Sequence, residues 1–482
     1  MWIEPDVCYR ALATHDARFD GRFFVGVTST GIYCRPVCRT RRVKRENCRF
    51  YLSAAAAEAA GFRPCLRCRP ELAPGHASVD TGGRLARAAA SRIEDGVLAD
   101  GSLTGLAASL GVTDRHLRRV FVAEFGVSPV AYAQTQRLLL AKRLLTDTAL
   151  PVTEIAMAAG FGSLRRFNAL FRERYRLQPR NLRRTPEAAA RDELVFDLAY
   201  CPPYAWEPQL AFLAARCAKG VEAVADKRYF RTVAIKREAT THYGWIAVAH
   251  RTRRRTLQVT LSGSLARVVP EVLGRMKHLF DLGCQPDEIA RTLGELGAAT
   301  PGLRVPGAFD GFEMAVRAVL GQQITVAAAS TLAGRIARVF GEPIETPFAN
   351  LTHAFPTPER LAAASGDELG RLGVTRSRQR AIHALAKGCT AGELVLAPGV
   401  DVEATLAKLR ALSGIGEWTA QYVAMRALAW PDAFPHTDHG IMQALGEKSP
   451  RRGLAIAEEW RPWRAYAAVH LWDSLPLKEK RS

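Results

Sequence analysis

The sequence lacks any apolar run that approaches the ~20 residues needed to cross a bilayer. Its beginning, MWIEPDVCYR, has neither the basic nor the apolar portion of a secretory signal. We therefore expect a cytoplasmic protein without a membrane partner, in a compartment that keeps thiols reduced. Such a compartment argues against a disulfide between Cys34 and Cys38, which lie close together in the motif GIYCRPVCRTRR.

Acidic residues are scarce relative to basic ones. Asp and Glu number 47 against 67 Lys and Arg, which gives a net charge of +20. An excess of this size indicates a polyanionic partner, most often nucleic acid. The alternative explanation for the positive charge is a GC-rich genome, in which Arg and Ala codons are abundant. The length of 482 residues exceeds what one core can hold and predicts three or four domains.

Four of the ten cysteines have the spacing of a metal site. Cys34 and Cys38 form a CxxxC pair, and Cys65 and Cys68 form a CxxC pair beyond a basic stretch and a short alanine-rich helix over residues 53–60. In a reduced compartment this pattern predicts one Zn²⁺ held by four thiolates. A purely architectural zinc is the alternative to a reactive one. The remaining cysteines are expected to be core or surface thiols: Cys8, Cys48, Cys201, Cys217, Cys284 and Cys389.

Residues 81–185 have the pattern of two helix-turn-helix units. In SLTGLAASLGVTDRHLRRVFVAEFGVSP, Gly111 turns the chain and Thr113 is placed to cap the second helix. The side chains expected to face inward are Leu103, Leu106, Ala107, Leu110, Leu117, Val120 and Phe121. PVTEIAMAAGFGSLRRFNALFRERYRLQP repeats the design after a long linking helix. Two such units can enter successive major grooves, so an oligomer is not required.

The second half of the chain has a different pattern of predicted secondary structure from the first half. Over residues 192–304, VFDLAY, YFRTVAI, WIAVAH and TLQVTLSG are typical of strands, and PQLAFLAARC and VPEVLGRMKHLFDL of helices. We expect an antiparallel sheet that carries helices. Residues 305–482 are expected to be helical, with Gly and Pro residues that separate the helices.

The cysteine motifs TSTGIYCRPVCRTRR and AAGFRPCLRCRP, within residues 1–75, resemble the N-terminal domain of Ada-type adaptive-response regulators. The resemblance implies that zinc-bound Cys34 accepts a methyl group from a DNA methyl phosphotriester, while Cys38, Cys65 and Cys68 complete the metal site. Zinc and neighbouring arginines would keep the thiolate ionised. Methylation removes one negative charge from the DNA-facing side, which should strengthen DNA binding. No route back is evident, so transfer would be stoichiometric.

The two helix-turn-helix units resemble the AraC-type DNA-binding domain, which follows the zinc domain in Ada-type regulators. The resemblance implies a transcriptional activator that binds promoter duplex and RNA polymerase. The residues expected to contact DNA are Arg115, His116, Arg118 and Arg119 on the first reading helix and Arg165, Arg166 and Asn168 on the second. Arginine contacts both bases and phosphates, and a merely solvated face is the alternative for each residue.

The tetrapeptide Pro-Cys-His-Arg, which marks a second methyltransferase domain in Ada-type regulators, is absent. Instead, LSGIGEWTAQY is typical of a helix-hairpin-helix, in which Gly414 and Gly416 permit a tight turn whose N–H groups hold a DNA phosphate. A monovalent cation is an optional ligand there. With FPHTDHG, VRAVLGQQITVAAAS and WRPWRAYAAVHLW, the hairpin resembles the AlkA-type 3-methyladenine DNA glycosylase II, over residues 192–477.

That resemblance implies a catalytic carboxylate at Asp438, which would stabilise the oxocarbenium-like sugar or orient water. A helix-capping role is the alternative, and Asp432 is the second candidate. Trp418, Tyr422 and Trp472 match the aromatic pocket for a flipped, cationic base, although each residue would also suit a core. Strand-cleaving relatives carry a Schiff-base lysine where this chain has Trp418, so we expect a glycosylase without lyase activity.

One position departs from the AlkA pattern. Where AlkA-type enzymes place an apolar wedge in the gap left by the flipped base, this chain has Gln322 and Gln323 followed by Ile324. Gln323 is able to fill the gap and to hydrogen-bond the orphaned partner base.

The predicted fold class is multidomain α+β. It comprises a small zinc domain (1–75), an all-α double helix-turn-helix domain (81–185), an antiparallel-sheet α+β domain (192–304) and an all-α helix-hairpin-helix domain (305–482). The predicted function combines methyl-phosphotriester sensing, transcriptional activation and excision of alkylated bases, in the bacterial cytoplasm at the nucleoid. The alternative is a zinc-containing AraC-type factor whose C-terminal half binds damaged DNA without catalysis.

Overall fold

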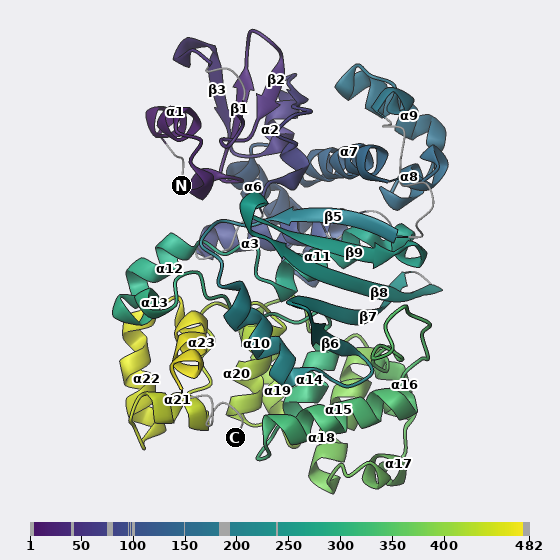
Figure 1. The fold of residues 1–482 in the computed structure, drawn as a ribbon, viewed down its shortest axis with the longest axis vertical. Helices are drawn as coiled ribbons and strands as arrows, with labels where there is room; N and C mark the ends of the chain where they lie inside the picture. The colour runs from purple at the N-terminus through teal and green to yellow at the C-terminus, as the bar shows by residue number, and fades with distance from the viewer. Residues whose placement is uncertain are drawn as a thin grey trace. The chain divides into compact units, whose positions relative to one another are not determined.

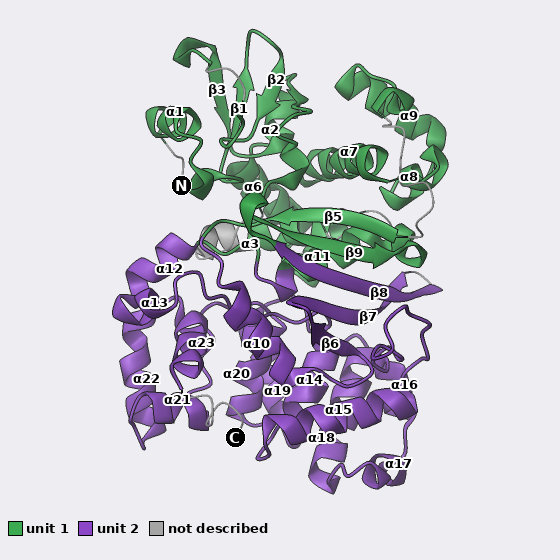
Figure 2. Ribbon diagram, viewed as in Figure 1, with its two compact units in different colours: residues 1–202, 251–277, 282–285 green, residues 203–250, 278–281, 286–482 purple. Residues whose placement is uncertain are grey.

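The computed structural model describes most of the chain as two compact units. Described are residues 4–39, 43–74, 81–94, 96, 98, 102–148, 150–182, 193–237 and 240–475. Unit 1 comprises Met1–Pro202, Arg251–Lys277 and Leu282–Gln285, and unit 2 comprises Pro203–His250, His278–Asp281 and Pro286–Ser482 (Figure 2). Among the described helices, none has the length and apolarity to cross a membrane. The four domain boundaries given above stay a prediction.

Unit 1 contains short strands and a series of helices (Figure 1). Its strands are β1 (Phe24–Val27), β2 (Ile32–Cys34), β3 (Cys48–Tyr51), β4 (Arg63–Pro64), β5 (Glu193–Ala199) and β9 (Thr256–Ser262). Its helices are α1 (Pro5–Ala13), α2 (Ala54–Ala59), α3 (Thr81–Glu94), α5 (Leu103–Ser109), α6 (Asp114–Phe125), α7 (Pro129–Asp147), α8 (Val152–Ala158), α9 (Leu164–Tyr175) and most of α11 (Val269–Leu279). Short 3₁₀ turns are η1 (Ala17–Phe19), η2 (Arg45–Asn47), η3 (Pro70–Leu72), η4 (Pro179–Leu182), η5 (Thr252–Arg254) and η6 (Gly263–Val268).

Unit 2 contains three strands and is otherwise helical. The strands are β6 (Glu222–Ala225), β7 (Arg228–Arg237) and β8 (Thr240–Arg251, whose last residue belongs to unit 1). The helices are α10 (Trp206–Arg216), α12 (Pro286–Leu293), α13 (Glu295–Ala299), α14 (Gly311–Leu320), α15 (Val326–Phe340), α16 (Pro358–Ala363), α17 (Gly366–Arg371), α18 (Arg376–Thr390), α19 (Val402–Ala411), α20 (Glu417–Arg426), α21 (His439–Ala444), α22 (Pro450–Ala457) and α23 (Arg464–Ser474), with the 3₁₀ turn η7 (Glu458–Trp460).

A four-stranded sheet at the start of the chain, in the order β3-β1-β2-β4, brings the cysteine motifs together. β1 pairs antiparallel with β2, so that Val25 lies opposite Cys34, and β4 runs parallel to β2. The Cys65 N–H donates to the Tyr33 carbonyl at 3.0 Å, which places the second cysteine motif beside the first. The alanine-rich helix was predicted and is α2, capped by Ser53. The four strands were not predicted.

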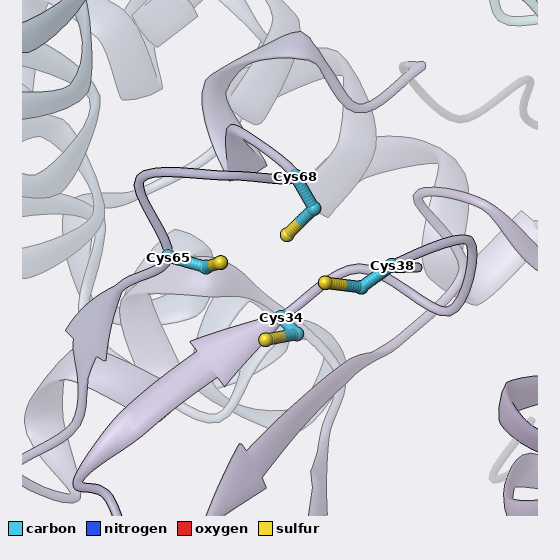
Figure 3. Close-up of side chains that lie close together, drawn as sticks. All are labelled: Cys34, Cys38, Cys65 and Cys68. Atoms are coloured by element: carbon cyan, nitrogen blue, oxygen red, sulfur yellow. The ribbon is translucent and has the colours of Figure 1, made fainter. Parts of the chain in front are cut away.

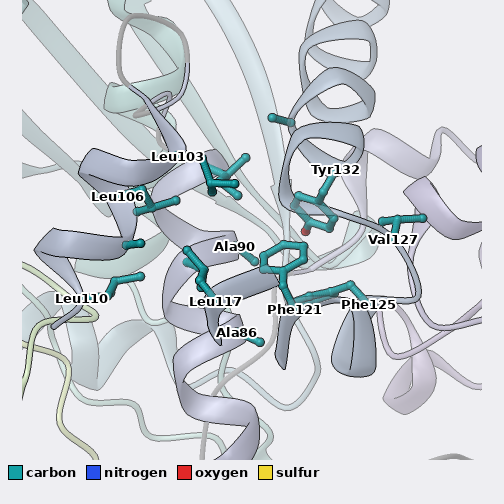
Figure 4. Packing of buried hydrophobic residues seen from close by; sticks show 14 of the residues in the cluster. Ala86, Ala90, Leu103, Leu106, Leu110, Leu117, Phe121, Phe125, Val127 and Tyr132 are labelled. Carbon is teal, nitrogen blue, oxygen red and sulfur yellow. The ribbon is translucent and has the colours of Figure 1, made fainter. Parts of the chain in front are cut away.

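The first helix-turn-helix unit is confirmed in detail (Figure 4). Gly111 adopts φ +70°, the left-handed region where glycine is favoured, and Thr113 Oγ1 accepts the His116 N–H at the start of α6. The seven inward-facing side chains named above are buried or partly buried in one cluster, with Leu117 and Phe121 fully inaccessible.

The second unit repeats this construction on α8 and α9. Ser163 caps α9 by accepting the Arg166 N–H, as Thr113 does for α6. Phe167, Phe171 and Tyr175 lie at i, i+4 and i+8 and form a buried column with ring centroids 5.4 and 4.8 Å apart. Because α9 buries its aromatic face, its arginines lie on the exposed side.

The predicted strands of the middle segment are present as β5, β7, β8 and β9. β5 pairs antiparallel with β9 in unit 1, and β6, β7 and β8 form an antiparallel meander in unit 2. β6 was not predicted. In unit 2, Glu222 of β6 and Arg231 of β7 join Glu313 and Arg317 of α14 in a buried ion-pair network, with Arg231–Glu313 and Arg317–Glu222 contacts of 2.7 Å. The network fixes the strands to α14, because an unpaired buried charge is strongly destabilising.

In unit 1, the carboxyl group of Glu58 is buried where α2 meets the helices. It accepts hydrogen bonds from Tyr33 Oη at 3.0 Å, Thr135 Oγ1 at 3.0 Å and Tyr175 Oη at 3.3 Å. These donors come from β2, α7 and α9. Burial raises the pKa of Glu58 to about 7, although the hydrogen bonds act in the opposite direction. Glu58 therefore joins the cysteine-bearing sheet to the second helix-turn-helix unit.

We predict that Glu58→Gln makes the stability of unit 1 less dependent on pH. Because folding raises the pKa of Glu58 from 4.5 to about 7, its protonation stabilises the fold fully below pH 4.5, and this contribution is lost as the pH rises through 7. Between pH 6 and pH 8 the loss amounts to about 1.4 kcal/mol, and a glutamine does not undergo it.

The measurement is the urea midpoint of unit 1 by pulse proteolysis of the zinc-loaded chain at pH 6 and pH 8. Glu58→Gln should gain stability over the wild type at pH 8 relative to pH 6. Glu46→Gln, at an exposed glutamate of the same sheet region, is the control and should show no such difference. Equal midpoint changes for Glu58→Gln at both pH values would contradict the prediction.

Candidate functional sites

The four predicted cysteine ligands converge on one point (Figure 3). The Sγ atoms of Cys34, Cys38, Cys65 and Cys68 all lie within 4.8 Å of one another, and three of the four residues are buried. Cys34 ends β2, Cys38 follows a turn in which its N–H donates to the Arg35 carbonyl, and Cys65 follows β4. Shared protons among the thiols, followed by burial, raise the pKa of Cys34 well above its ordinary value.

This donor set fits zinc. A tetrahedral Zn²⁺ with Zn–S bonds of ≈ 2.3 Å needs sulfur–sulfur distances of about 3.8 Å, which four sulfurs this close together provide with small adjustments. Four clustered thiolates repel one another, and a divalent cation relieves that repulsion while keeping the sulfurs deprotonated. The six other cysteines lie outside this cluster and are buried or partly buried.

The arginines of the first motif do not all face the same way. Arg35 is buried, its guanidinium paired with buried Asp20 and donating from Nη1 to the Cys68 carbonyl at 3.2 Å. Its backbone N–H donates to Cys68 Sγ at 3.4 Å. Arg35 is therefore a support of the cysteine loop and not a phosphate ligand, whereas Arg39 and Arg67 are exposed. Arg41 and Arg42 lie outside the described residues.

The residues expected to contact DNA lie on the outer faces of the two reading helices. Arg115, Arg118 and Arg119 of α6 are exposed, and His116 is half-buried. Arg118 pairs with Asp114 at 2.9 Å, one turn away, and Arg119 contacts the His116 ring at 3.2 Å. On α9, Arg165 and Arg166 are exposed and Asn168 is half-buried. Counted from the capping residues Thr113 and Ser163, Arg115 and Arg165 occupy equivalent positions, whereas the neighbouring polar residues differ between the two helices.

The predicted hairpin precedes α20. Gly414 adopts φ +87°, and a Cβ there would lie 3.1 Å from Ala381 Cβ and 3.3 Å from the Ser377 carbonyl, so only glycine fits without displacing α18. Gly416 is different: its φ is −92°, and a Cβ would meet nothing within 4 Å inside the protein. No described side chain caps the start of α20. Gly416 therefore keeps an uncapped helix start open to a ligand such as a phosphate.

Asp438 stands at the centre of the second site. Its Oδ2 accepts the indole N–H of Trp418 at 2.8 Å, and its Oδ1 accepts that of Trp472 at 2.9 Å. Oδ1 also accepts the Ile441 N–H at 3.0 Å, which caps α21. The helix-capping role considered as the alternative is therefore present, and the same carboxylate also holds two indole N–H groups. The three donors fix its orientation between two aromatic rings.

The second candidate carboxylate, Asp432, has a different environment. It is buried in a forked ion pair, with Arg464 Nε and Nη2 donating to its two oxygens at 2.7 and 2.9 Å, and Arg461 pairs with it as well. Both oxygens are occupied by guanidinium groups. Asp432 therefore joins the loop before α21 to the start of α23, and Asp438 is the better candidate for catalysis.

The three predicted aromatic residues gather around Asp438. Trp418 and Tyr422, four residues apart on α20, stack with ring centroids 5.1 Å apart at an angle of 12°, and Trp472 lies 6.2 Å from Tyr422. Phe212 of α10 adds a fourth ring, 6.2 Å from Trp472. Phe212 was not predicted as a site residue, although it lies in the helix predicted for PQLAFLAARC.

Two arginines beside the pocket were also missed. Arg426 Nη1 donates to Tyr422 Oη at 2.6 Å, and the Arg216 guanidinium lies 3.7 Å from the centroid of the Phe212 ring. Burial would raise the pKa of the Tyr422 phenol, but Arg426 and Arg216 outweigh burial and lower it. The spacing of Phe212 and Arg216, one turn apart on α10, was the available signal.

Gln322 and Gln323 have separate roles in the structure. Gln322 Nε2 donates to the Gly414 carbonyl and to Thr419 Oγ1, both at 2.9 Å, and Arg378 donates to the Gln322 carbonyl. Gln322 is thus anchored to the hairpin. Gln323 is exposed and adopts φ +54°, a left-handed conformation that is uncommon outside glycine. Of the two side chains, that of Gln323 is the one placed to project outward.

A four-sulfur centre, paired helix-turn-helix units and a carboxylate set among aromatic rings beside a glycine hairpin define a multidomain DNA repair and DNA-binding protein. Four segments match known families. Residues 7–71 match the metal binding domain of Ada, 106–185 a helix-turn-helix domain, 195–310 the AlkA N-terminal domain, and 316–451 the HhH-GPD superfamily of base excision DNA repair proteins. Together with the cysteine cluster, these matches establish one Zn²⁺ site and double-stranded DNA as a partner.

Similar proteins agree with this assignment. The chain is 39% identical to the probable bifunctional transcriptional activator/DNA repair enzyme AlkA of Mycobacterium tuberculosis, over 97% of this chain and 96% of that protein. It is 41% identical to DNA-3-methyladenine glycosylase 2 of Escherichia coli over 58% of this chain and 96% of that protein. It is 37% identical to the bifunctional transcriptional activator/DNA repair enzyme Ada of Escherichia coli over 33% of this chain and 43% of that protein. The chain belongs to the family of bifunctional transcriptional activator/DNA repair enzymes of the AlkA type, which confirms the resemblances noted in the sequence.

We predict that Asp20→Ala weakens the zinc centre although Asp20 is not a ligand. The substitution leaves the Arg35 guanidinium buried without its carboxylate, and breaking a buried pair costs roughly 3–5 kcal/mol. Because Arg35 also holds the Cys68 loop, zinc should pass to a chromophoric chelator faster than from the wild type. Asp16→Ala is the matched control, since it breaks an exposed pair with Arg18 worth roughly 0–1 kcal/mol. Equal zinc release from both variants would contradict the prediction.

Proposed function

We propose that this chain senses methyl phosphotriesters at Cys34, activates transcription through its helix-turn-helix units and excises alkylated purines at Asp438. The observation that carries the enzymatic part is the Asp438 carboxylate held by two indole N–H groups among aromatic side chains. The convergence of four sulfurs at the end of β2 supports the sensing part. The names of the similar proteins support the combination of both in one chain.

In the sensing step, Cys34 Sγ attacks the methyl carbon of a neutral phosphotriester. The carbon–oxygen bond breaks, its electron pair stays on the phosphate oxygen, and a phosphodiester anion and an S-methyl cysteine result. Bound zinc keeps the cysteine sulfurs deprotonated at neutral pH. Cys65 and Cys68 each accept a backbone N–H, at 3.4 Å, which withdraws charge from their sulfurs. Within the described residues Cys34 Sγ accepts no such backbone N–H, so its sulfur retains more negative charge than those of Cys65 and Cys68.

Methylation of Cys34 changes the charge that faces the DNA. A thiolate becomes a neutral thioether, so the exposed Arg39 and Arg67 face the phosphates with one less opposing charge. Removing a negative charge strengthens binding to a polyanion. The reading faces of α6 and α9 then select the promoter, and activation follows from contact with RNA polymerase. One chain carries two reading helices, so the proposal needs no dimer.

In the excision step, the alkylated base leaves and water adds to the sugar. Alkylation at a ring nitrogen makes the base cationic, so the electron pair of the breaking glycosidic bond neutralises it and little acid catalysis is needed. Asp438 stabilises the positive charge that develops on the sugar. Water then bonds to the sugar carbon and gives up its proton to solvent. The rings of Trp418, Tyr422, Trp472 and Phe212 receive the flipped cationic base.

The proposed glycosylase cuts no DNA strand. Lyase chemistry needs an amine that forms a Schiff base, and the position at which strand-cleaving relatives carry a lysine holds Trp418. Its indole nitrogen donates to Asp438 and has no nucleophilic lone pair.

Gln322 anchors the adjacent loop, and Gln323 enters the gap left by the flipped base. Gly416 and the start of α20 hold a DNA phosphate.

We predict that the wild-type zinc-loaded chain, incubated with methylated DNA, gains one methylene mass on Cys34. Cys34 and Cys38 lie on one tryptic peptide because Arg35 precedes a proline, so fragment ions must separate the two sites. Cys34→Ala should gain no mass, and the methylated wild type should bind promoter duplex several-fold more tightly than the unmethylated chain. Mass on Cys38 would show that the wrong sulfur has been named. No added mass, with persisting phosphotriesters, would remove the sensing function.

We predict that Asp438→Asn lowers the release of 3-methyladenine by at least ~10²-fold. The amide retains a capping oxygen for the Ile441 N–H, but its NH₂ group meets an indole N–H donor and it carries no charge. Asp401→Asn is the matched control, because Asp401 also caps a helix in unit 2, accepting the Ala404 N–H at 3.0 Å, and it is exposed.

The control should release base at the wild-type rate, and Asp438→Asn should still bind a duplex with an abasic analogue. The product duplex should stay uncut until alkali is added, and borohydride should trap no covalent complex. Unchanged release by Asp438→Asn would mean that another carboxylate acts. Absence of release by the wild type would leave a protein that binds damaged DNA without catalysis.

A further inference from the structure

The N-terminal turns of α18 lie directly beside the hairpin and the Gln323 loop in unit 2. The Gly414 turn approaches α18 so closely that an added Cβ would lie 3.1 Å from Ala381 Cβ and 3.3 Å from the Ser377 carbonyl. Arg378 donates to the Gln322 carbonyl, and Gln322 in turn donates to the Gly414 carbonyl. These interactions join α18, the hairpin and the loop into one continuous region.

Two arginines of α18 stay outside these interactions. Arg376 and Arg380 are both exposed, and they lie four residues apart, on one face of the helix. Ser377 and Ala381, which face the hairpin, each follow one of these arginines by a single residue, or 100° around the helix. Arg376 and Arg380 therefore flank the face that packs on the hairpin, within reach of a ligand that lies across it.

The charge of this flank is not compensated. Within the described part of the chain, no acidic side chain forms an ion pair with Arg376 or Arg380, although other arginines of unit 2 are paired, such as Arg410 with Glu417 at 2.6 Å. Exposed, unpaired arginines at one-turn spacing suit a partner with repeated negative charges. The positive end of the fifteen-residue helix α18 adds to the same field.

We propose that Arg376 and Arg380 bind backbone phosphates of the duplex, beside the gap that Gln323 fills. The inference rests on the proposed glycosylase function, because the hairpin and Gln323 define where the duplex lies. It adds to the hairpin a second place at which the protein holds the DNA backbone, on the helix that packs against the hairpin. Neither arginine was predicted from the sequence as a DNA-binding residue.

Two phosphate-binding arginines predict a specific change in salt dependence. The slope of log K against log salt is negative, about −0.9 for each phosphate of B-DNA that a protein neutralises, so the double variant Arg376→Gln/Arg380→Gln should make the slope less steep by about 2. Recognition of bases would instead make the weakening depend on the base opposite the gap. The slope and the opposite-base dependence together separate the two kinds of recognition.

The experiment measures binding of the full zinc-loaded chain to a duplex that carries a tetrahydrofuran abasic analogue, over a series of salt concentrations and with each of the four opposite bases. Arg451→Gln/Arg452→Gln is the matched control, because it removes the same charge from exposed residues of α22. We expect roughly tenfold weaker binding for the α18 variant at physiological salt, equal for all opposite bases, and near-wild-type slopes for the control.

A wild-type slope for the α18 variant would overturn the inference, and so would a loss of affinity confined to one opposite base. A slope change of equal size in the control would also overturn it, since general charge would then explain the effect. Release of 3-methyladenine by the wild type is measured in parallel. Failure of that release contradicts the proposed function, whereas release with an unchanged slope contradicts only the assignment of Arg376 and Arg380.

Discussion

Two indole N–H groups donate to opposite oxygens of one carboxylate, Asp438, and much of unit 2 is arranged so that both bonds form. Trp418 comes from α20 and Trp472 from α23, so the two helices must meet at the start of α21. Gly440 makes room for this, because a Cβ there would lie 3.3 Å from both Asp438 Oδ1 and Trp472 Cδ1. Gln421 of α20 accepts the Phe434 N–H at 3.2 Å and holds the preceding loop. The role proposed for Asp438, facing a developing cation, needs this rigidity more than it needs a particular solvent exposure.

In unit 1, too, buried polar side chains are held in place by hydrogen bonds and ion pairs from segments far apart in the chain. Three buried charged side chains of this unit meet partners from distant segments: Asp20 meets Arg35, Glu58 meets two tyrosines and a threonine, and Glu71 meets Lys142 at 2.6 Å. A buried pair with good geometry contributes little net stability, but losing one partner is severe. The cysteine centre is thus held by a scaffold that tolerates few changes, although its own sheet is made of very short strands.

The features that the sequence predicted are those whose signals are local. Capping residues such as Thr113, the left-handed Gly111 and the two cysteine pairs each specify their structure within a few residues. Asp438 and its three aromatic neighbours were found through motifs rather than through geometry, and their roles stay a proposal. The strands of the middle segment followed from their apolar, β-branched composition, and the helices around them followed from their helical spacing of apolar residues.

What was missed depends on interactions between segments far apart in the chain. Strands β1 to β4 have two to four residues each, too few for a period to be visible, and they form because their partners align. Arg35 lies in a run of arginines, and only the fold shows that Asp20 draws it inward. Phe212 and Arg216 come from a helix more than two hundred residues before Trp418, so no local pattern connects them to the pocket.

The hydrogen bonds of Glu58 fix the cysteine-bearing sheet to helices α7 and α9 of the helix-turn-helix region. Tyr33 precedes Cys34 in the chain, and the Glu58 carboxyl group that Tyr33 shares with Thr135 and Tyr175 ties the Cys34 strand to both α7 and the end of α9. After Cys68 in the chain, Glu71 pairs with Lys142 and Arg69 pairs with Asp147, both in the C-terminal half of α7. A fragment cut after residue 75 would keep the Tyr33–Glu58 and Arg69–Glu71 hydrogen bonds but would lose the donors that α7 and α9 supply to the same two carboxylates. Residues 1–75 therefore depend on α7 and α9 for part of their buried hydrogen bonding. Fused to a different DNA-binding domain, they would have to include these two helices.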